Sequence, residues 1–198
     1  MESTKNYVYR VSSSILNKIN NTKETSKTKA LLANIRNSVD KDMSDNIETM
    51  AYIFSNVPED YLGHNDELSH MEVATITAVQ LYAIHQQGNT LSVYENRDDK
   101  LNIGDALSTL RGGESESIDR RFNVMITSSN FKELKHHLRQ LIKILKAKSD
   151  AKVDYAKLAA DLYCYLAGNK DGVKLSWSRS YYKFRKNEKM EGEIQNEE

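Results

Sequence analysis

The sequence predicts an all-α protein, an elongated bundle of about eight to nine helices. Three observations predict this class. The 198 residues include one proline and eight glycines, which is few for a chain of β-strands and tight turns. Apolar residues recur at helical spacing along most of the chain. Helix-start and helix-stop signals flank several of these segments.

The predicted helices follow one another with short connections. The third of them ends before Pro58, because the residue that precedes a proline disfavours helical dihedrals. Ser69 with Glu72, and Asn130 with Glu133, form capping-box patterns that open two further helices. The predicted helices cover residues 5–20, 26–39, 45–57, 70–87, 102–111, 115–128, 131–148, 154–168 and 173–184.

The glycine pair Gly112-Gly113 is the predicted boundary between two lobes. On this division, residues 1–112 form an N-terminal helical lobe and residues 113–188 form a C-terminal helical lobe. Residues 189–198 are expected to be a flexible acidic tail, because they combine many charges with few apolar side chains.

Cysteine content and hydropathy indicate a cytoplasmic protein. The chain has a single cysteine, Cys164, which excludes an intrachain disulfide and fits a reducing compartment. The first residues contain no apolar core of a signal peptide. No apolar run approaches the roughly 20 residues that a membrane span needs.

Formal charge cancels over the chain but is unevenly distributed. The 28 basic and 28 acidic side chains give a net charge of zero. Residues 1–39 carry seven basic and two acidic side chains, whereas residues 40–119 carry four and sixteen. Residues 120–149 carry eight and one, residues 150–186 eight and four, and residues 187–198 one and five. Two basic regions separated by an acidic one indicate charged partners.

The segment FKELKHHLRQLIKILKAK, residues 131–148, concentrates the basic charge. On a helix, its leucines and isoleucine gather on one side. Five cations share the opposite side at spacings of three and four residues: Lys132, Lys135, Arg139, Lys143 and Lys146. We call these five residues the first basic stripe. Like charges at this spacing repel one another by a few tenths of a kcal/mol per pair, which favours an anionic partner. A solvated helix face and a membrane-surface helix are the alternatives.

A second basic stripe lies near the end of the chain. In WSRSYYKFRK, the aromatic residues Trp177 and Tyr181 share one helix face, while Arg179 and Lys183 share the opposite face. The aromatic face is typical of a protein core, although Tyr182 lies off both faces and could stack on a base.

Three more arginines are candidate anion contacts. Arg120 is predicted to point away from the buried face of its helix, whereas Arg121 borders the core and could instead be a structural ion-pair partner. Arg36 is the lone charge within an apolar helical segment and is open to the same two interpretations.

The sequence contains no motif typical of an enzyme. It lacks HExxH, GxxxxGK[ST], GxSxG and GxGxxG patterns, each of which has a defined catalytic or phosphate-binding geometry. His85 follows an apolar helix and is expected to be a buried histidine with a hydrogen-bond partner. His64 and His70 flank an acidic loop that could bind a divalent cation weakly. We therefore expect no catalytic residue, no metal and no cofactor.

Four segments, in this order, resemble the CasB family, the small subunit of the type I-E CRISPR Cascade surveillance complex. They read AVQLYAIHQQG, IGDALSTLRGG, IDRRFNVMITSSNFKELKHHLRQLIKILKA and VDYAKLAADLYCYL…VKLSWSRSYY. The resemblance covers roughly residues 27–184. It implies an all-helical, non-catalytic subunit, two copies of which stack head to tail beside the backbone and large subunits of the complex.

The resemblance also implies nucleic-acid partners. A basic face would hold the crRNA–target assembly and the displaced non-target DNA strand through their backbones, while base pairing reads the sequence. Family-like basic positions fall on Arg36, Arg120, Arg121, Arg139, Lys143, Arg179 and Lys183. Two other functions stay open: a helical adaptor whose basic faces bind an acidic protein, and an enzyme with an unrecognised site.

Overall fold

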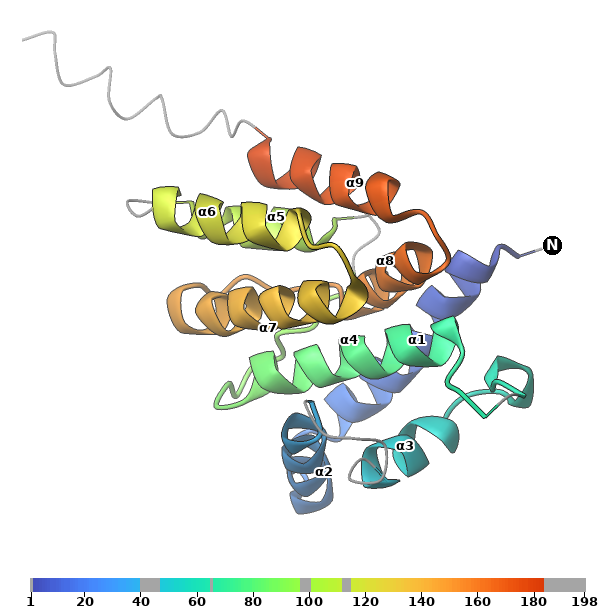
Figure 1. Cartoon of the computed structure of the whole chain (residues 1–198). Helices are drawn as coiled ribbons and strands as arrows, with labels where there is room; N and C mark the ends of the chain where they lie inside the picture. The colour runs from blue at the N-terminus through green and yellow to red at the C-terminus, as the bar shows by residue number, and fades with distance from the viewer. Residues whose placement is uncertain (1, 40–46, 65, 97–100, 112–114, 184–198) are drawn as a thin grey trace, which may run out of the picture.

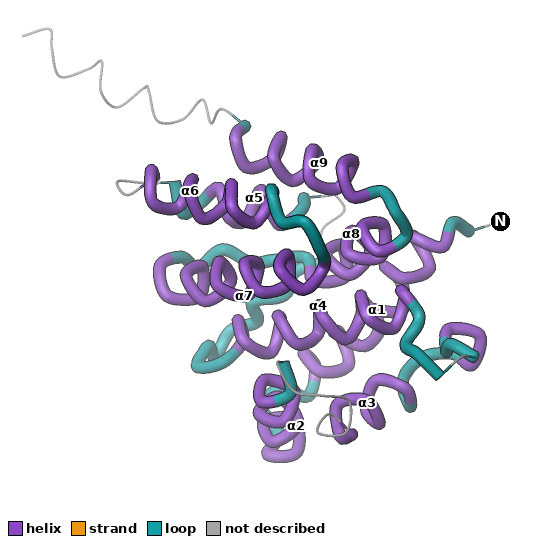
Figure 2. The backbone as a smooth tube through the Cα atoms, in the orientation of Figure 1, coloured by secondary structure: helices purple, strands orange, loops and turns teal. Residues whose placement is uncertain are grey.

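The computed structural model describes residues 2–39, 47–64, 66–96, 101–111 and 115–183 (Figure 1). Within these ranges it contains nine α-helices, one 3₁₀ turn and no β-strand, which confirms the predicted all-α class. Figure 2 shows helices joined by short loops throughout the described part of the chain. One isolated bridge, between Tyr94 and Val153, is the only β-type pairing that these ranges contain.

The helices lie where the sequence predicts them, with ends shifted by a few residues. Their bounds are α1 Thr4–Asn21, α2 Ser26–Asn37, α3 Ile47–Phe54, α4 His70–Gln86, α5 Ile103–Ser108, α6 Ser115–Ile126, α7 Phe131–Lys148, α8 Tyr155–Leu166 and α9 Lys170–Tyr182. The 3₁₀ turn η2, Glu59–Tyr61, falls in a segment that the sequence predicts to be a polar loop.

Capping explains several helix starts. Ser69 and Glu72 form the predicted capping box of α4. At α7, Asn130 accepts a hydrogen bond from the Glu133 backbone N–H at 2.9 Å, but the Glu133 carboxylate accepts from the backbone N–H of Ser129 and not of Asn130. The predicted box at α7 is therefore only half correct. Asn102 and Asp105 form a capping box at α5 that the sequence analysis missed.

Helix α4 lies at the centre of the bundle. It packs against α1, α2, α3, α7 and α8, and its buried residues are spread around its whole circumference. A helix with no polar face is stable in water only when other elements surround it. Figure 1 shows α4 enclosed in this way.

Helix α1 packs along α8, so the first helix of the chain contacts the last helix but one (Figure 1). Tyr9 donates a hydrogen bond from its hydroxyl to Asp154 Oδ2 at 3.2 Å. Helices on both sides of residue 112 contribute to one continuous apolar cluster, which runs from Val8 to Tyr181. The division into two lobes stays a prediction. Its boundary, Gly112-Gly113, and the predicted tail at residues 189–198 lie outside the described residues.

Candidate nucleic-acid interface

Helix α7 carries the first basic stripe on the side opposite its core contacts. Leu134, Leu138, Leu141, Ile142 and Leu145 are buried. Lys132 and Lys143 are exposed, as the sequence predicts, but Lys135, Arg139 and Lys146 are partly buried. Burial lowers the pKa of the Lys135 ammonium group. Two of the five members of the stripe are therefore exposed, and three are partly covered by the protein.

The far end of this stripe meets helix α2. Lys146 Nζ donates a hydrogen bond to Gln87 Oε1 at 3.1 Å, just past the end of α4. Burial, and then the positive charge of nearby Arg36, lower the pKa of Lys146. Burial also lowers the pKa of Arg36. Two partly desolvated cations that repel each other across two helices form a favourable place for an anion.

A pocket of about 320 Å³ opens next to Arg36 and Gln87. Its other lining residues include Lys23, Lys29 and the loop Gly88–Thr90. Lys23 and Lys29 are not among the candidate residues of the sequence. Lys29 lies seven residues before Arg36 on α2 and shares its helix face, so spacing could have found it, whereas Lys23 joins them only through the fold. Lys29 lies 3.2 Å from Glu24 in an exposed ion pair, and Lys23 donates to the carbonyl of Thr90 at 2.6 Å.

Helix α6 confirms the predicted exposure of Arg120 and contradicts the predicted core position of Arg121. Arg120 forms an exposed ion pair with Glu116, at 3.3 Å. Arg121, predicted to border the core, is exposed and has no ion-pair partner within the described ranges. Helical spacing explains this: the residue four positions before Arg120 is an acid, whereas the residue four positions before Arg121 is Ser117.

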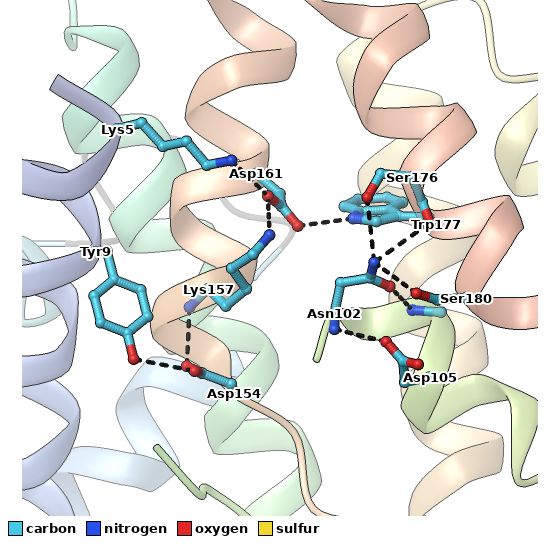
Figure 3. A network of polar contacts seen from close by, with 11 residues as sticks. Lys5, Tyr9, Asn102, Asp105, Asp154, Lys157, Asp161, Ser176, Trp177 and Ser180 are labelled. Atoms are coloured by element: carbon cyan, nitrogen blue, oxygen red, sulfur yellow. Dashed lines mark hydrogen bonds and ion pairs between the residues drawn. The ribbon is translucent and has the colours of Figure 1, made fainter. Parts of the chain in front are cut away.

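A buried carboxylate holds α9, which carries the second basic stripe (Figure 3). Asp161, only 4% exposed, accepts a hydrogen bond from Trp177 Nε1 at 3.0 Å. The same carboxylate forms an ion pair with Lys157 and lies 3.8 Å from Lys5 Nζ. Asp161 therefore connects α1, α8 and α9 at one point.

Helix α5 holds the other side of α9. Asn102 Nδ2 donates to Ser180 Oγ at 2.9 Å and to Ser176 Oγ at 3.3 Å, as Figure 3 shows. Gly104 is in closer contact: a Cβ atom at this position would lie 2.1 Å from the Trp177 carbonyl oxygen. With its inner face fixed in this way, α9 leaves Arg179 and Lys183 exposed.

Tyr182 is not an open stacking surface. Its ring lies edge-on to Phe122 and to Tyr181, with centroid distances of 5.8 and 4.9 Å. The Arg111 guanidinium lies 5.0 Å from the Tyr182 ring centroid. Trp177 and Tyr181 are fully buried, as their shared helix face predicts.

The two basic stripes lie on different layers of the bundle. Helix α5 packs against both α7 and α9, and Figure 1 shows α5 and α6 between them. The fold thus gathers Arg36 with the α7 stripe at one end of the molecule. Arg179 and Lys183 lie elsewhere, on and directly after α9.

His85 is buried, and its Nδ1 lies 2.9 Å from the Tyr155 hydroxyl. In the part of the chain that the structure describes, no cluster of three or more histidine, cysteine or acidic side chains could hold a metal ion. None of the described helices combines the length and apolarity needed to cross a bilayer.

These features define a helical protein with several cationic surfaces. The sequence model of the CRISPR-associated protein Cse2 family matches residues 31–182. This chain therefore belongs to the Cse2 family, and the resemblance noted in its sequence is confirmed. Among curated protein sequences, none matches it.

Solved structures confirm the fold. The crystal structure of CasB from Thermobifida fusca is 20% identical, with a TM-score of 0.70, and the match covers 88% of this chain and 97% of that chain. CasB from Thermus thermophilus is also 20% identical, with a TM-score of 0.62 and coverage of 86% and 97%. CasB from M. ruber is 18% identical, with a TM-score of 0.63 and coverage of 81% and 87%.

Proposed function

We propose that this protein is the non-catalytic small subunit of a type I-E CRISPR Cascade complex and that it holds nucleic-acid backbone on its basic helix faces. Membership of the Cse2 family supports the assignment to a CRISPR system. Its partners would be the crRNA, the two strands of target DNA, the backbone and large subunits, and a second copy in a head-to-tail stack. The compartment would be the cytoplasm.

The observation that carries the nucleic-acid part is the electrostatics around Arg36 and Lys146. Desolvation lowers the pKa of both residues, and repulsion from Arg36 lowers the pKa of Lys146 further, so the charged forms are disfavoured. A phosphate oxygen between them would remove this repulsion and gain charge-assisted hydrogen bonds. Lysine suits backbone contacts, since an ammonium group attracts phosphate without requiring bidentate geometry.

A binding titration at several salt concentrations tests this function. The isolated protein should bind unrelated single- and double-stranded sequences about equally, with dissociation constants of roughly a micromolar or weaker. Replacing Lys132 and Lys143 with alanine should reduce the steepness of the log–log salt dependence by up to about two units, since each phosphate contact contributes about 0.7 to 0.9. Both side chains are exposed, so the helical circular dichroism signal should not change.

Arg10 and Lys18 provide a matched control. Both lie on α1, away from α7, where they contact Glu2 and Asn56. Replacing this pair with alanine also removes two positive charges, but it should leave the salt dependence nearly unchanged. An equal decrease of the salt dependence in both double variants would indicate that net charge alone governs binding. Salt-sensitive binding to an acidic protein, without any binding to nucleic acid, would favour the adaptor function instead.

A further inference from the structure

The outer surface formed by α6 and α9 combines apolar and cationic side chains. Leu175 is 50% exposed, Tyr182 is 42% exposed and Val124 is 44% exposed. Leu175, Arg179 and Tyr182 follow the three- and four-residue spacing of a single helix face. With Lys183, these residues form what we call the α6–α9 patch.

Two contacts bring the parts of the patch together. Lys174 Nζ donates a hydrogen bond to the Ser128 carbonyl at 2.8 Å, and the Tyr182 hydroxyl donates to Asn123 Oδ1 at 2.7 Å. These contacts place α9 alongside the second half of α6. Val124 therefore lies beside the exposed face of α9, and the apolar side chains are not isolated from one another. Clustered exposed apolar residues mark interaction surfaces, whereas single ones do not.

The cations of the patch are not neutralised locally. Elsewhere in the same region, Arg111 pairs with Asp119 at 3.0 Å and Arg120 pairs with Glu116 at 3.3 Å. In the described part of the chain, no ion pair involves Arg179 or Lys183. The patch therefore fits a partner that supplies several carboxylates and a few apolar side chains.

The sequence that follows α9 has this composition. Residues 187–198, NEKMEGEIQNEE, lie outside the described residues and contain five glutamates and one lysine. Met190 and Ile194, four residues apart, are the apolar side chains of this segment. Three residues separate it from Lys183. A flexible coil of twelve residues spans about 20 Å root-mean-square, which exceeds the roughly 12 Å of α9 between Leu175 and Lys183.

We propose that residues 187–198 dock on the α6–α9 patch and compete there with nucleic acid for Arg179 and Lys183. This regulation rests on the nucleic-acid function proposed above. Tethering makes the competition effective, because a short linker gives an effective concentration in the millimolar range. At an effective concentration of about 1 mM, a segment with an intrinsic dissociation constant of about 0.1 to 0.5 mM occupies the patch for roughly two-thirds to nine-tenths of the time and is displaced by a longer polyanion.

Removal of the segment tests the competition. A chain ending at Lys186 should bind single-stranded DNA about three- to tenfold more tightly than the full chain at low salt, the factor expected from a millimolar effective concentration. The gain should shrink as salt screens the charges. A full-length variant with Glu188, Glu191, Glu193, Glu197 and Glu198 changed to glutamine should show the same gain. Equal affinity of the full and shortened chains would overturn the proposal and leave the binding function intact.

A charge-neutral change distinguishes docking from diffuse repulsion. Replacing Val124 and Leu175 with serine removes the apolar contacts of the segment and leaves every charge in place. In the full chain this variant should bind DNA more tightly, and in the chain ending at Lys186 it should bind as the unchanged sequence does. The same effect in both backgrounds would overturn docking at this patch.

A peptide experiment tests docking without nucleic acid. Adding a synthetic peptide of residues 187–198 to the ¹⁵N-labelled chain ending at Lys186 should shift the amide signals of Val124, Leu175 and Tyr182, and added salt should reverse the shifts. Absence of shifts at a few millimolar peptide would overturn the docking. If the peptide shifts these signals while neither chain binds DNA, the docking stands and the proposed function is wrong.

Discussion

Asp161 is a single buried carboxylate with three partners from three helices. Removing one member of a buried charge pair leaves the other members desolvated without compensation. Here the Trp177 indole N–H and the Lys157 ammonium would lose their acceptor at the same time. The position of α9, and with it the exposure of Arg179 and Lys183, depends on this residue.

Asp161→Ala should therefore lower the free energy of unfolding by about 3 kcal/mol. Asp161→Asn should cost less, because an amide oxygen can still accept from Trp177. Urea unfolding followed by circular dichroism measures both values. If the alanine and asparagine variants are both as stable as the original chain, Asp161 does not hold α9.

His85 gives the protein a defined response to acid. Burial first, and the charge of Lys146 second, lower the pKa of His85 from 6.5 to about 4. Between these two values the unfolded chain binds a proton at this site and the folded chain does not. The contribution of His85 to the free energy of unfolding is therefore fully present above about pH 6.5. It is lost as the pH drops toward 4, by about 3 kcal/mol in total.

Unfolding midpoints measured from pH 7 to pH 4 test this prediction. The variant His85→Gln should be less sensitive to acid over this range, since glutamine does not titrate. His136→Gln, at an exposed position of α7, should retain the original pH dependence. Equal pH dependence of the His85 variant and the original chain would assign the acid response to other groups.

At the scale of elements, the close contact of α5 with α9 requires a residue without a side chain. A methyl group at Gly104 would lie 2.1 Å from the Trp177 carbonyl oxygen, which is backbone and has little freedom to move away. Gly104→Ala should lower stability by about 2 kcal/mol, in the range of overpacked cores. Thermal unfolding measures the loss, and Gly88→Ala, which meets no atom within 4 Å but has φ +82°, separates steric overlap from backbone strain.

The two basic stripes should act independently, since α5 and α6 lie between α7 and α9 (Figure 1). Changing Lys132 and Lys143 to alanine, and separately Arg179 and Lys183, should each reduce the salt dependence by about one to two units. The fourfold variant should show the sum of both effects. Salt titrations of the three variants in the chain ending at Lys186 measure this. A fourfold variant no weaker than one of the double variants would indicate a single shared path.

The hydrophobic periodicity of the sequence predicts the helices well, but it does not predict which helices pack against one another. The buried leucines of α7 and the buried Trp177 and Tyr181 of α9 follow from spacing alone. The proximity of Arg36 and Lys146 does not, because it depends on how α2 and α7 meet α4. The same holds for the partial burial of Lys135. The ion pair of Arg120 follows from helical spacing as well, since Glu116 lies four residues before it.

At the scale of the whole molecule, the fold converts a neutral chain into one with localised charge. Cations from α2 and α7 approach one another at Arg36 and Lys146, while Arg179 and Lys183 lie on the α6–α9 patch. Arg36 and Lys146, which lie close together, are more than a hundred residues apart in the sequence. The same is true of Lys5 and Asp161, whose contact supports α9. Net charge, which is zero here, gives no information about such surfaces.

The packing of α1 against α8 also has a consequence for synthesis of the protein on the ribosome. Tyr9 reaches its partner Asp154 across 145 residues. At about 5 to 20 residues per second, the ribosome needs roughly 7 to 30 seconds to make that distance. During this time the apolar face of α1, with Val8, Val11 and Ile15, lacks the α8 surface that covers it in the finished protein. A chaperone would therefore bind this chain while only its N-terminal half has been made. A cluster of slowly translated codons before α8 would lengthen this interval.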